Sequence, residues 1–156
     1  MIHTLFRKYG SPPYKFAVIH GGPGAPGYMA PVAKELSHLM GIIEPLQTKD
    51  TIDGQVEELY TVLNEHAQLP VNLIGHSWGG FLNIIFYDKY PDVVDKIILI
   101  SSGPFEEKYV KMIRETRSSR LSKKAIEETK KIERNLYDKD QPKKTELLQS
   151  GRRKKN

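Results

Sequence analysis

The sequence contains no cysteine. Disulfide bonds, thiolate zinc sites and a thiol nucleophile are therefore excluded. It also has no apolar run near the roughly 20 residues that a membrane-spanning helix needs. Its first eight residues lack the apolar stretch and the cleavage site of a signal peptide. These absences predict a cytoplasmic protein without a membrane partner.

Acidic and basic residues are unevenly divided along the chain. Residues 1–105 hold 7 Lys and Arg against 10 Asp and Glu, whereas residues 106–156 hold 17 against 9. The two signs alternate at helical spacing in the basic part, which is typical of solvent-exposed helices. Nucleic-acid binding is an alternative, but only Tyr109 and Tyr137 in this part could stack on bases. We therefore do not expect a nucleic-acid partner.

Strand-like and helix-like segments alternate between residues 14 and 100. This order is typical of an α/β protein in which helices cover a mostly parallel sheet. Apolar runs predict strands at 16–19, from 42 onward, at 71–74 and at 96–100. Helical spacing predicts helices at 31–40, at 81–90, at 106–118, at 123–137 and at 142–149. Another helix is expected to begin at a cap at Asp53 and to end before Pro70, and Ser122 is expected to cap the helix at 123–137. The helix at 81–90 is apolar on nearly every side and is therefore expected to be buried on nearly every side.

The segment Gly75-His-Ser-Trp-Gly79 matches the pattern G-x-S-x-G between an expected strand and an expected helix. A nucleophilic serine needs a sharp strand-to-helix turn that exposes its hydroxyl, and side chains two residues to either side would collide there. The pattern predicts Ser77 as the nucleophile, with the positive end of the following helix favouring negative charge. The alternative is a glycine-rich turn in which Ser77 has no chemical role.

The segment His-Gly-Gly-Pro-Gly at residues 20–24 directly follows another expected strand. Acyl transfer needs two N–H donors aimed at the carbonyl oxygen as it becomes an oxyanion. Trp78 supplies one, and because Pro23 has no N–H, Gly22 is expected to supply the other. A phosphate-binding loop is the alternative, but the Lys and the Ser or Thr of a P-loop are missing. The remaining residues that support the two motifs are His20, Gly21, Gly24, Gly75 and Gly79.

Together these two motifs, on successive strand–helix units, resemble the α/β-hydrolase fold family, specifically its prolyl aminopeptidase-like branch. The resemblance covers about residues 5–105. It implies the sheet order 4-3-5-6, in the family's strand numbers, for the four expected strands. It also implies hydrolysis of an amide, peptide or ester bond through an acyl-enzyme on Ser77, with a small-molecule or peptide substrate and with no cofactor or metal. The chain would then divide into a hydrolase core at 1–105 and a basic, helical, lid-like segment at 106–156.

The family's catalytic triad runs serine, acid, histidine in chain order. Here none of the five histidines follows Ser77; they are His3, His20, His38, His66 and His76. Among them His20 is nearest to the expected site, although bonding of the loop backbone is its plainer role. We therefore predict the N-terminal portion of a serine hydrolase, truncated before its acid and base and weak or inactive by itself. The alternative is a binding module that performs no chemistry.

The last expected strand, residues 96–100, is an inner strand in the resembled family. No strand-like run follows it in this sequence. An apolar strand left at the edge of a sheet offers unpaired backbone groups to other chains. The sequence therefore predicts self-association through this edge, or marginal stability.

Overall fold

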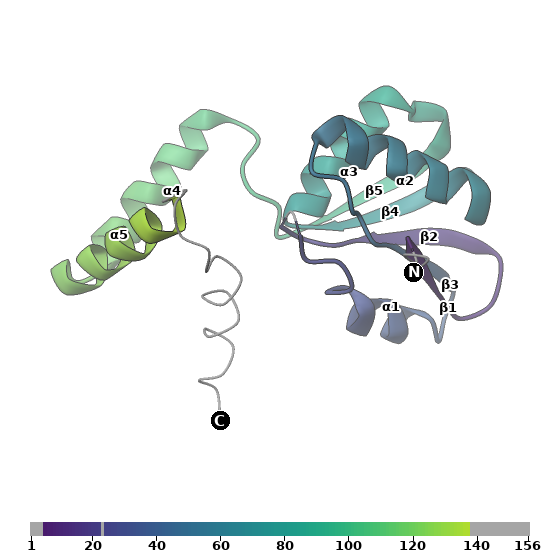
Figure 1. Ribbon diagram of the computed structural model, residues 1–156, viewed down its shortest axis with the longest axis horizontal. Helices are drawn as coiled ribbons and strands as arrows, with labels where there is room; N and C mark the ends of the chain where they lie inside the picture. Colours follow the sequence, from purple (N-terminus) through teal and green to yellow (C-terminus); the bar gives the residue numbers. More distant parts are fainter. Residues whose placement is uncertain (1–4, 23, 138–156) are drawn as a thin grey trace. The chain divides into compact units, whose positions relative to one another are not determined.

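A computed structural model describes residues 5–22 and 24–137 of the chain (Figure 1). It contains two compact units that divide between Gly103 and Pro104, two residues before the division expected from the sequence. The first unit carries a sheet with its covering helices, and the second carries two helices. The short helix expected at residues 142–149 lies outside the described residues.

Five strands form one sheet in the order β1-β3-β2-β4-β5. Strand β1 runs antiparallel to β3, and all other neighbours are parallel. The order of β3, β2, β4 and β5 confirms the predicted family order 4-3-5-6, whereas β1 was not among the strands predicted from the sequence. The strands are β1 Phe6–Tyr9, β2 Tyr14–Ile19, β3 Gly41–Pro45, β4 Val71–His76 and β5 Val94–Ile100.

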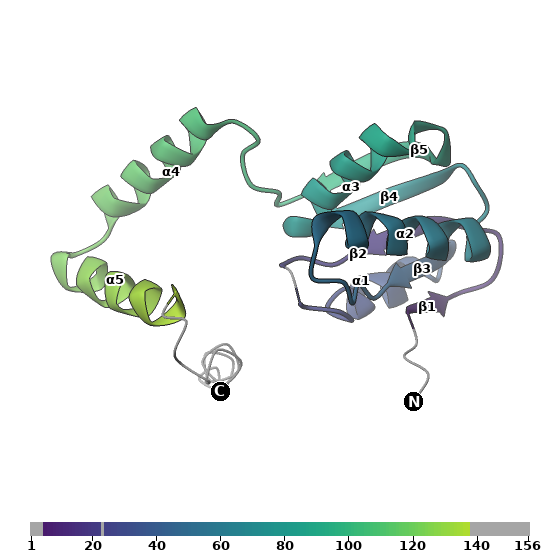
Figure 2. The ribbon, with the colours of Figure 1, turned by 45° about the horizontal axis from the view of Figure 1, so that its top comes forward.

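Helices cover both faces of this sheet (Figures 1 and 2). On one face α2, Ile52–His66, and α3, Trp78–Lys89, pack on the alternate residues Ala17, Ile19 and Leu73. On the other face α1, Ala30–Leu36, packs with Met29 on Val18, Ile42 and Ile74. A short 3₁₀ helix, η1 Pro91–Val93, leads into β5. Because both faces of the central strands are buried, these strands read in the sequence as continuous apolar runs.

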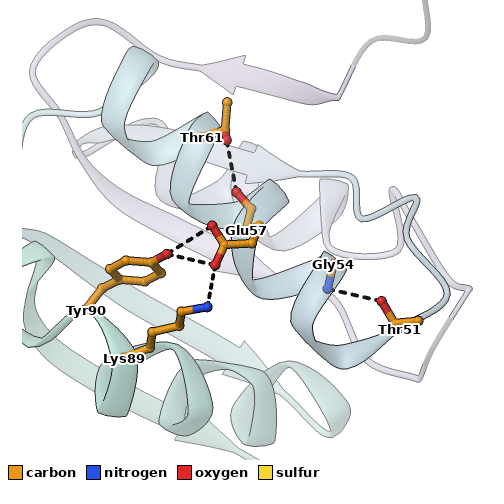
Figure 3. A network of polar contacts seen from close by, with 6 residues as sticks. All are labelled: Thr51, Gly54, Glu57, Thr61, Lys89 and Tyr90. Atoms are coloured by element: carbon orange, nitrogen blue, oxygen red, sulfur yellow. Dashed lines mark hydrogen bonds and ion pairs between the residues drawn. The ribbon is translucent and has the colours of Figure 1, made fainter.

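The start of α2 differs from the prediction. Its N-cap is Thr51, whose hydroxyl accepts a hydrogen bond from the N–H of Gly54 at 3.1 Å (Figure 3). Asp53 instead lies in the first turn, where its negative charge interacts favourably with the positive end of the helix dipole. Threonine and aspartate both suit the cap position, and the chain enters the helix two residues earlier than expected.

Helix α2 is tied to the end of α3 by a polar network around Glu57 (Figure 3). Its carboxylate accepts hydrogen bonds from Nζ of Lys89 at 2.5 Å and from the hydroxyl of Tyr90 at 2.8 Å. These contacts hold the pKa of Glu57 below its usual value. They join the last turn of α3 to the middle of α2.

Helix α3 was predicted to be buried on nearly every side, and this prediction is wrong. Leu82 and Phe86 are buried, but Ile84, Ile85 and Tyr87 are 37–47% exposed. Because these positions carry apolar residues, the sequence pattern predicted burial on every side of the helix. In the part of the chain that the structure describes, nothing covers this side of the helix fully.

The second unit consists of α4, Glu107–Arg120, and α5, Lys123–Tyr137. As predicted, Ser122 caps α5, because its hydroxyl accepts a hydrogen bond from the N–H of Ala125 at 3.2 Å. Helix α4 has no buried residue. Of the helices in the described ranges, none is long and apolar enough to cross a bilayer.

Candidate active site

Ser77 stands alone between the end of β4 at His76 and the start of α3 at Trp78. Its backbone has φ 51° and ψ −114°, a region that side chains other than glycine rarely adopt and that costs about 1–3 kcal/mol. Its N–H donates to the carbonyl oxygen of Ile100 at 3.0 Å, and its own carbonyl accepts the N–H of Gly80 at 3.0 Å. Its hydroxyl does not cap the helix that follows. The surrounding hydrogen bonds thus hold a strained turn and leave the hydroxyl for other contacts.

The two flanking glycines are where this turn is most crowded. A Cβ atom on Gly75 would lie 2.5 Å from the carbonyl oxygen of Gly79. A Cβ atom on Gly79 would overlap the carbonyl oxygen of Ile19, the last residue of β2. The start of α3 therefore packs directly on the end of β2, and neither position has room for a larger residue.

The loop after β2 reaches the same end of the sheet. Because β2 and β4 are parallel neighbours with Ile19 opposite Gly75, their carboxyl ends lie side by side. A Cβ atom on Gly21 would lie 2.8 Å from Nδ1 of His76 and 3.2 Å from Cβ of Ser77. The structure thus brings the loop and the serine turn into contact, as both motifs require.

The two expected oxyanion donors occupy different surroundings. Gly22 has φ 51° and Gly24 has φ 89°, and a Cβ atom on either would meet no atom within 4 Å, so this part of the loop borders open space. The backbone N–H of Trp78 is in the first turn of α3, where N–H groups lack partners within the helix. The indole of Trp78 donates to Oε1 of Gln55 in α2 at 3.0 Å. Its side chain is thus held by α2.

His20 is buried, with 1% of its surface exposed. Its Nδ1 lies 3.2 Å from the carbonyl oxygen of Gly21, which matches the plainer role of holding the loop backbone. Burial lowers the pKa of His20, while the Gly21 carbonyl and the nearby Glu44 oppose this shift. Its Nε2 is buried and makes no hydrogen bond within the described ranges. His20 is therefore neutral near pH 7 and held beside the loop.

A polar cluster next to His20 was not found by reasoning from the sequence. Glu44, fully buried at the end of β3, accepts a hydrogen bond from the hydroxyl of Tyr9 at 2.7 Å and lies 3.6 Å from the guanidinium of Arg7. A Cβ atom on Gly27 would lie 2.9 Å from the same guanidinium. Strand β1 thus contacts both β3 and the loop after β2. The signal was a single acidic residue in an otherwise apolar strand.

The other histidines make separate contacts. The ring of His76 stacks on Tyr28, with their centroids 6.0 Å apart. His66, the last residue of α2, stacks on Phe6 at 4.1 Å. His38 follows α1 and lines an open cavity at the amino ends of β2 and β3, away from the carboxyl end that carries Ser77. His3 lies outside the described residues.

Strand β5 ends next to Ser101 and Ser102. Ser101 has φ 48° and, apart from Ser77, is the one residue other than glycine with positive φ in the described chain. A Cβ atom on Gly80 would overlap Oγ of Ser102, so α3 also packs closely on the end of β5. Within the ranges that the structure describes, His, Asp and Glu side chains do not gather in threes at any place that could hold a metal ion.

Residues 16–138 match the family model described as the alpha/beta hydrolase fold. The chain belongs to this family. Its similarity to curated proline iminopeptidases puts it in the prolyl aminopeptidase-like branch. It is 33% identical over 117 residues to the proline iminopeptidase of Lactobacillus helveticus, and the aligned region covers 64% of this chain and 40% of that protein. It is 28% identical over 128 residues to the proline iminopeptidase of Saccharolobus solfataricus, covering 71% and 41%.

Solved structures share the fold of this α/β hydrolase. The epoxide hydrolase CorEH superposes with a TM-score of 0.56 at 19% identity, covering 70% of this chain and 45% of that one. The thioesterase domain from the curacin biosynthetic pathway gives 0.56 at 20% identity, covering 70% and 46%. The chain spans about 40% of the length of the curated relatives it matches.

Proposed function

We propose that the first unit carries the nucleophile and oxyanion part of a serine hydrolase that cleaves an amide, peptide or ester bond. The observation that carries this proposal is the strained backbone of Ser77, at φ 51°, in contact with the loop that follows β2. Such strain persists only where the surrounding structure imposes it, and it is typical of functional sites. Because the curated relatives are named proline iminopeptidases, a short peptide is the first amide substrate to test.

In the proposed reaction, Oγ of Ser77 attacks the carbonyl carbon of the substrate. The electron pair of the carbonyl moves to its oxygen, and the N–H groups of Trp78 and Gly22 stabilise that oxyanion. Collapse of the intermediate expels the amine or alcohol and leaves an ester on Ser77. Water then attacks this ester, which releases the acid and restores the hydroxyl.

The proton of the Ser77 hydroxyl has to pass to a base and from it to the leaving group. His20 is held on the carbonyl of Gly21, and the ring of His76 stacks on Tyr28. We therefore propose that hydrolysis by this chain is weak. Loss of the triad histidine costs on the order of 10⁶ in kcat in a well-studied serine protease, and the oxyanion hole and binding supply the residual rate.

The test is hydrolysis of an activated aryl ester by the full chain, compared with the variants Ser77→Ala and Ser101→Ala. Ser101 is the matched control, because it is the other serine with positive φ. We expect a rate slightly above background that Ser77→Ala removes and Ser101→Ala leaves unchanged. Equal rates in all three proteins would contradict the assignment of Ser77. A turnover in the ordinary range of roughly 1–10³ s⁻¹ would contradict the weak activity, and His20→Gln would then test His20 as the base.

A binding module without chemistry is the second candidate. It is favoured by the neutral, buried state of His20 and by the contacts that occupy His76. Calorimetry with a non-hydrolysable amide distinguishes the two. Binding that persists in Ser77→Ala, together with no ester hydrolysis by the unchanged chain, supports the binding module.

A further inference from the structure

The outer edge of β5 is an apolar edge of the sheet. Strand β5 pairs with β4 through residues 94–100, and in the described chain no strand pairs with its other edge. Three consecutive apolar residues on it, Ile98, Leu99 and Ile100, are each 39–43% exposed. An exposed apolar edge strand is a template for pairing with another chain.

Helix α3 extends this apolar surface. A Cβ atom on Gly80 would lie 3.3 Å from Cδ2 of Leu99, so this side of α3 faces β5. Residues four and seven positions later, Ile84 and Tyr87, lie on the same side of a helix, and both are exposed. Figure 2 shows α3 lying along β4 and β5. We call these residues the β5 patch; its members are Ile84, Ile85, Tyr87, Ile98, Leu99 and Ile100. Leu99 lies on the face of the sheet that carries α3, and Ile98 and Ile100 lie on the opposite face, because side chains alternate along a strand.

We propose that the β5 patch is the interface of a symmetric dimer of this chain, in which β5 pairs antiparallel with β5 of a second copy. A twofold axis perpendicular to the sheet places both α3 helices on the same face of one continuous sheet. The contact therefore pairs the free backbone groups of β5 and also brings Ile84 and Tyr87 against their counterparts. One symmetric contact thus pairs the two β5 strands and joins the α3 sides of the two copies.

The distribution of charge favours a second copy as the occupant. Asp95 and Lys96, both exposed, lie near the start of β5, before its exposed apolar residues. Antiparallel pairing carries the two copies of each charge to opposite ends of the contact and brings the apolar residues together at its centre. This is the arrangement of an apolar core with a polar rim that protein interfaces have.

The register of the pairing is restricted. Side chains directly opposite each other in an antiparallel pair lie on the same face of the sheet. With the twofold axis perpendicular to the sheet, a residue at the centre faces its own counterpart. A twofold axis at Ile98 or at Leu99 places the largest number of apolar residues of one β5 strand opposite apolar residues of the other.

The absence of cysteine from the sequence makes a direct test possible. A single cysteine at Ile98 or at Leu99 can form a disulfide only with its counterpart in another copy. Opposite Cβ atoms in an antiparallel pair are about 4.5–5.5 Å apart, and relaxation to about 3.8 Å allows the bond. We expect Ile98→Cys or Leu99→Cys to convert the full chain to a covalent dimer on mild oxidation. The control Leu39→Cys, at a residue that is 80% exposed outside the patch, should remain uncrosslinked.

The mass in solution gives a second, independent measurement. Light scattering with size exclusion should give twice the 17.8 kDa of one chain, falling to one chain in Ile98→Lys and unchanged in Leu39→Lys. A monomeric chain whose Ile98→Cys thiol resists a thiol reagent would show that the second unit covers the patch. A mass that grows without limit would show open association instead of a dimer. Either result, or a monomer with a reactive thiol and no crosslink, overturns the proposal.

Discussion

Two adjacent glycines in α3 test how closely this helix packs on the ends of its neighbouring strands. A Cβ atom on Gly79 would overlap the carbonyl oxygen of Ile19 and lie 2.8 Å from that of His20. A Cβ atom on Gly80 would overlap Oγ of Ser102 and lie 3.1 Å from its Cβ. The first obstacle is backbone in the sheet, which can move little, and the second is a side chain, which can be removed.

Replacing a glycine by alanine inside a helix normally stabilises it by about 0.5–1 kcal/mol. Overpacking of a tight contact costs about 1–3 kcal/mol. For Gly79→Ala we expect the overlap with backbone to prevail, which gives a net loss of about 1–2 kcal/mol. Since about 1 kcal/mol shifts Tm by roughly 4–8 °C in a unit of this size, Tm should fall by about 5–15 °C.

Gly80→Ala should also destabilise the first unit, but Ser102→Ala should then recover most of the loss. The hydroxyl of Ser102 is buried and makes no hydrogen bond in the described chain, so its removal has little cost. Combining Ser102→Ala with Gly79→Ala should recover nothing. Urea unfolding followed by circular dichroism at one fixed protein concentration measures all five proteins. A Gly79→Ala protein as stable as the unchanged chain would refute the contact between α3 and the end of β2.

Three further outcomes follow from the polar contacts. Thr51→Ala should cost about 1 kcal/mol in urea unfolding, and Asp53→Ala less, because Thr51 caps α2. Lys89 lowers the pKa of Glu57 in the folded protein. The stabilisation by Glu57 is therefore present above the pKa that this residue has in the unfolded chain, and it is lost as the pH falls through the folded pKa. The variant Glu57→Gln should flatten that part of the profile of stability against pH. Burial lowers the pKa of His20 below 6.5, so the free energy of unfolding should decline as the pH falls from 6.5 toward the folded pKa. The variant His20→Gln should remove this decline. An equal slope in both proteins would contradict this expectation.

Many of the strands and helices could be predicted from the sequence because their signals are local. The apolar runs of β2, β4 and β5 each end at a turn that contains glycine, and the two motifs give the order of the strands through the family they resemble. The cap at Ser122 depends on the hydrogen bond it forms with Ala125, three residues away. Such features need no knowledge of distant contacts.

The features that were missed depend on contacts between distant segments. The role of Glu44 comes from Tyr9, 35 residues away on an antiparallel strand that the apolar pattern did not reveal. The periodicity of α3 shows that Ile84 and Tyr87 are apolar, but it cannot show whether another element covers them. Both Thr51 and Asp53 can cap a helix, and only the path of the chain decides between them.

The structure locates the surface through which self-association was predicted more closely than the sequence does. The sequence indicated an apolar strand at an edge. The structure adds the exposed side of α3 to the same surface and so allows a defined symmetric contact. The cysteine variants Ile98→Cys and Leu99→Cys test whether the edge pairs in this way.

We propose Ser77 as the reactive serine of this chain. The most direct measurement is covalent labelling by an aryl fluorophosphonate, followed by intact mass and by peptide mapping of the labelled residue. We expect slow labelling at a single site that maps to Ser77, absent in Ser77→Ala and retained in Ser101→Ala. Labelling that persists unchanged in Ser77→Ala, or that maps to another serine, would contradict it.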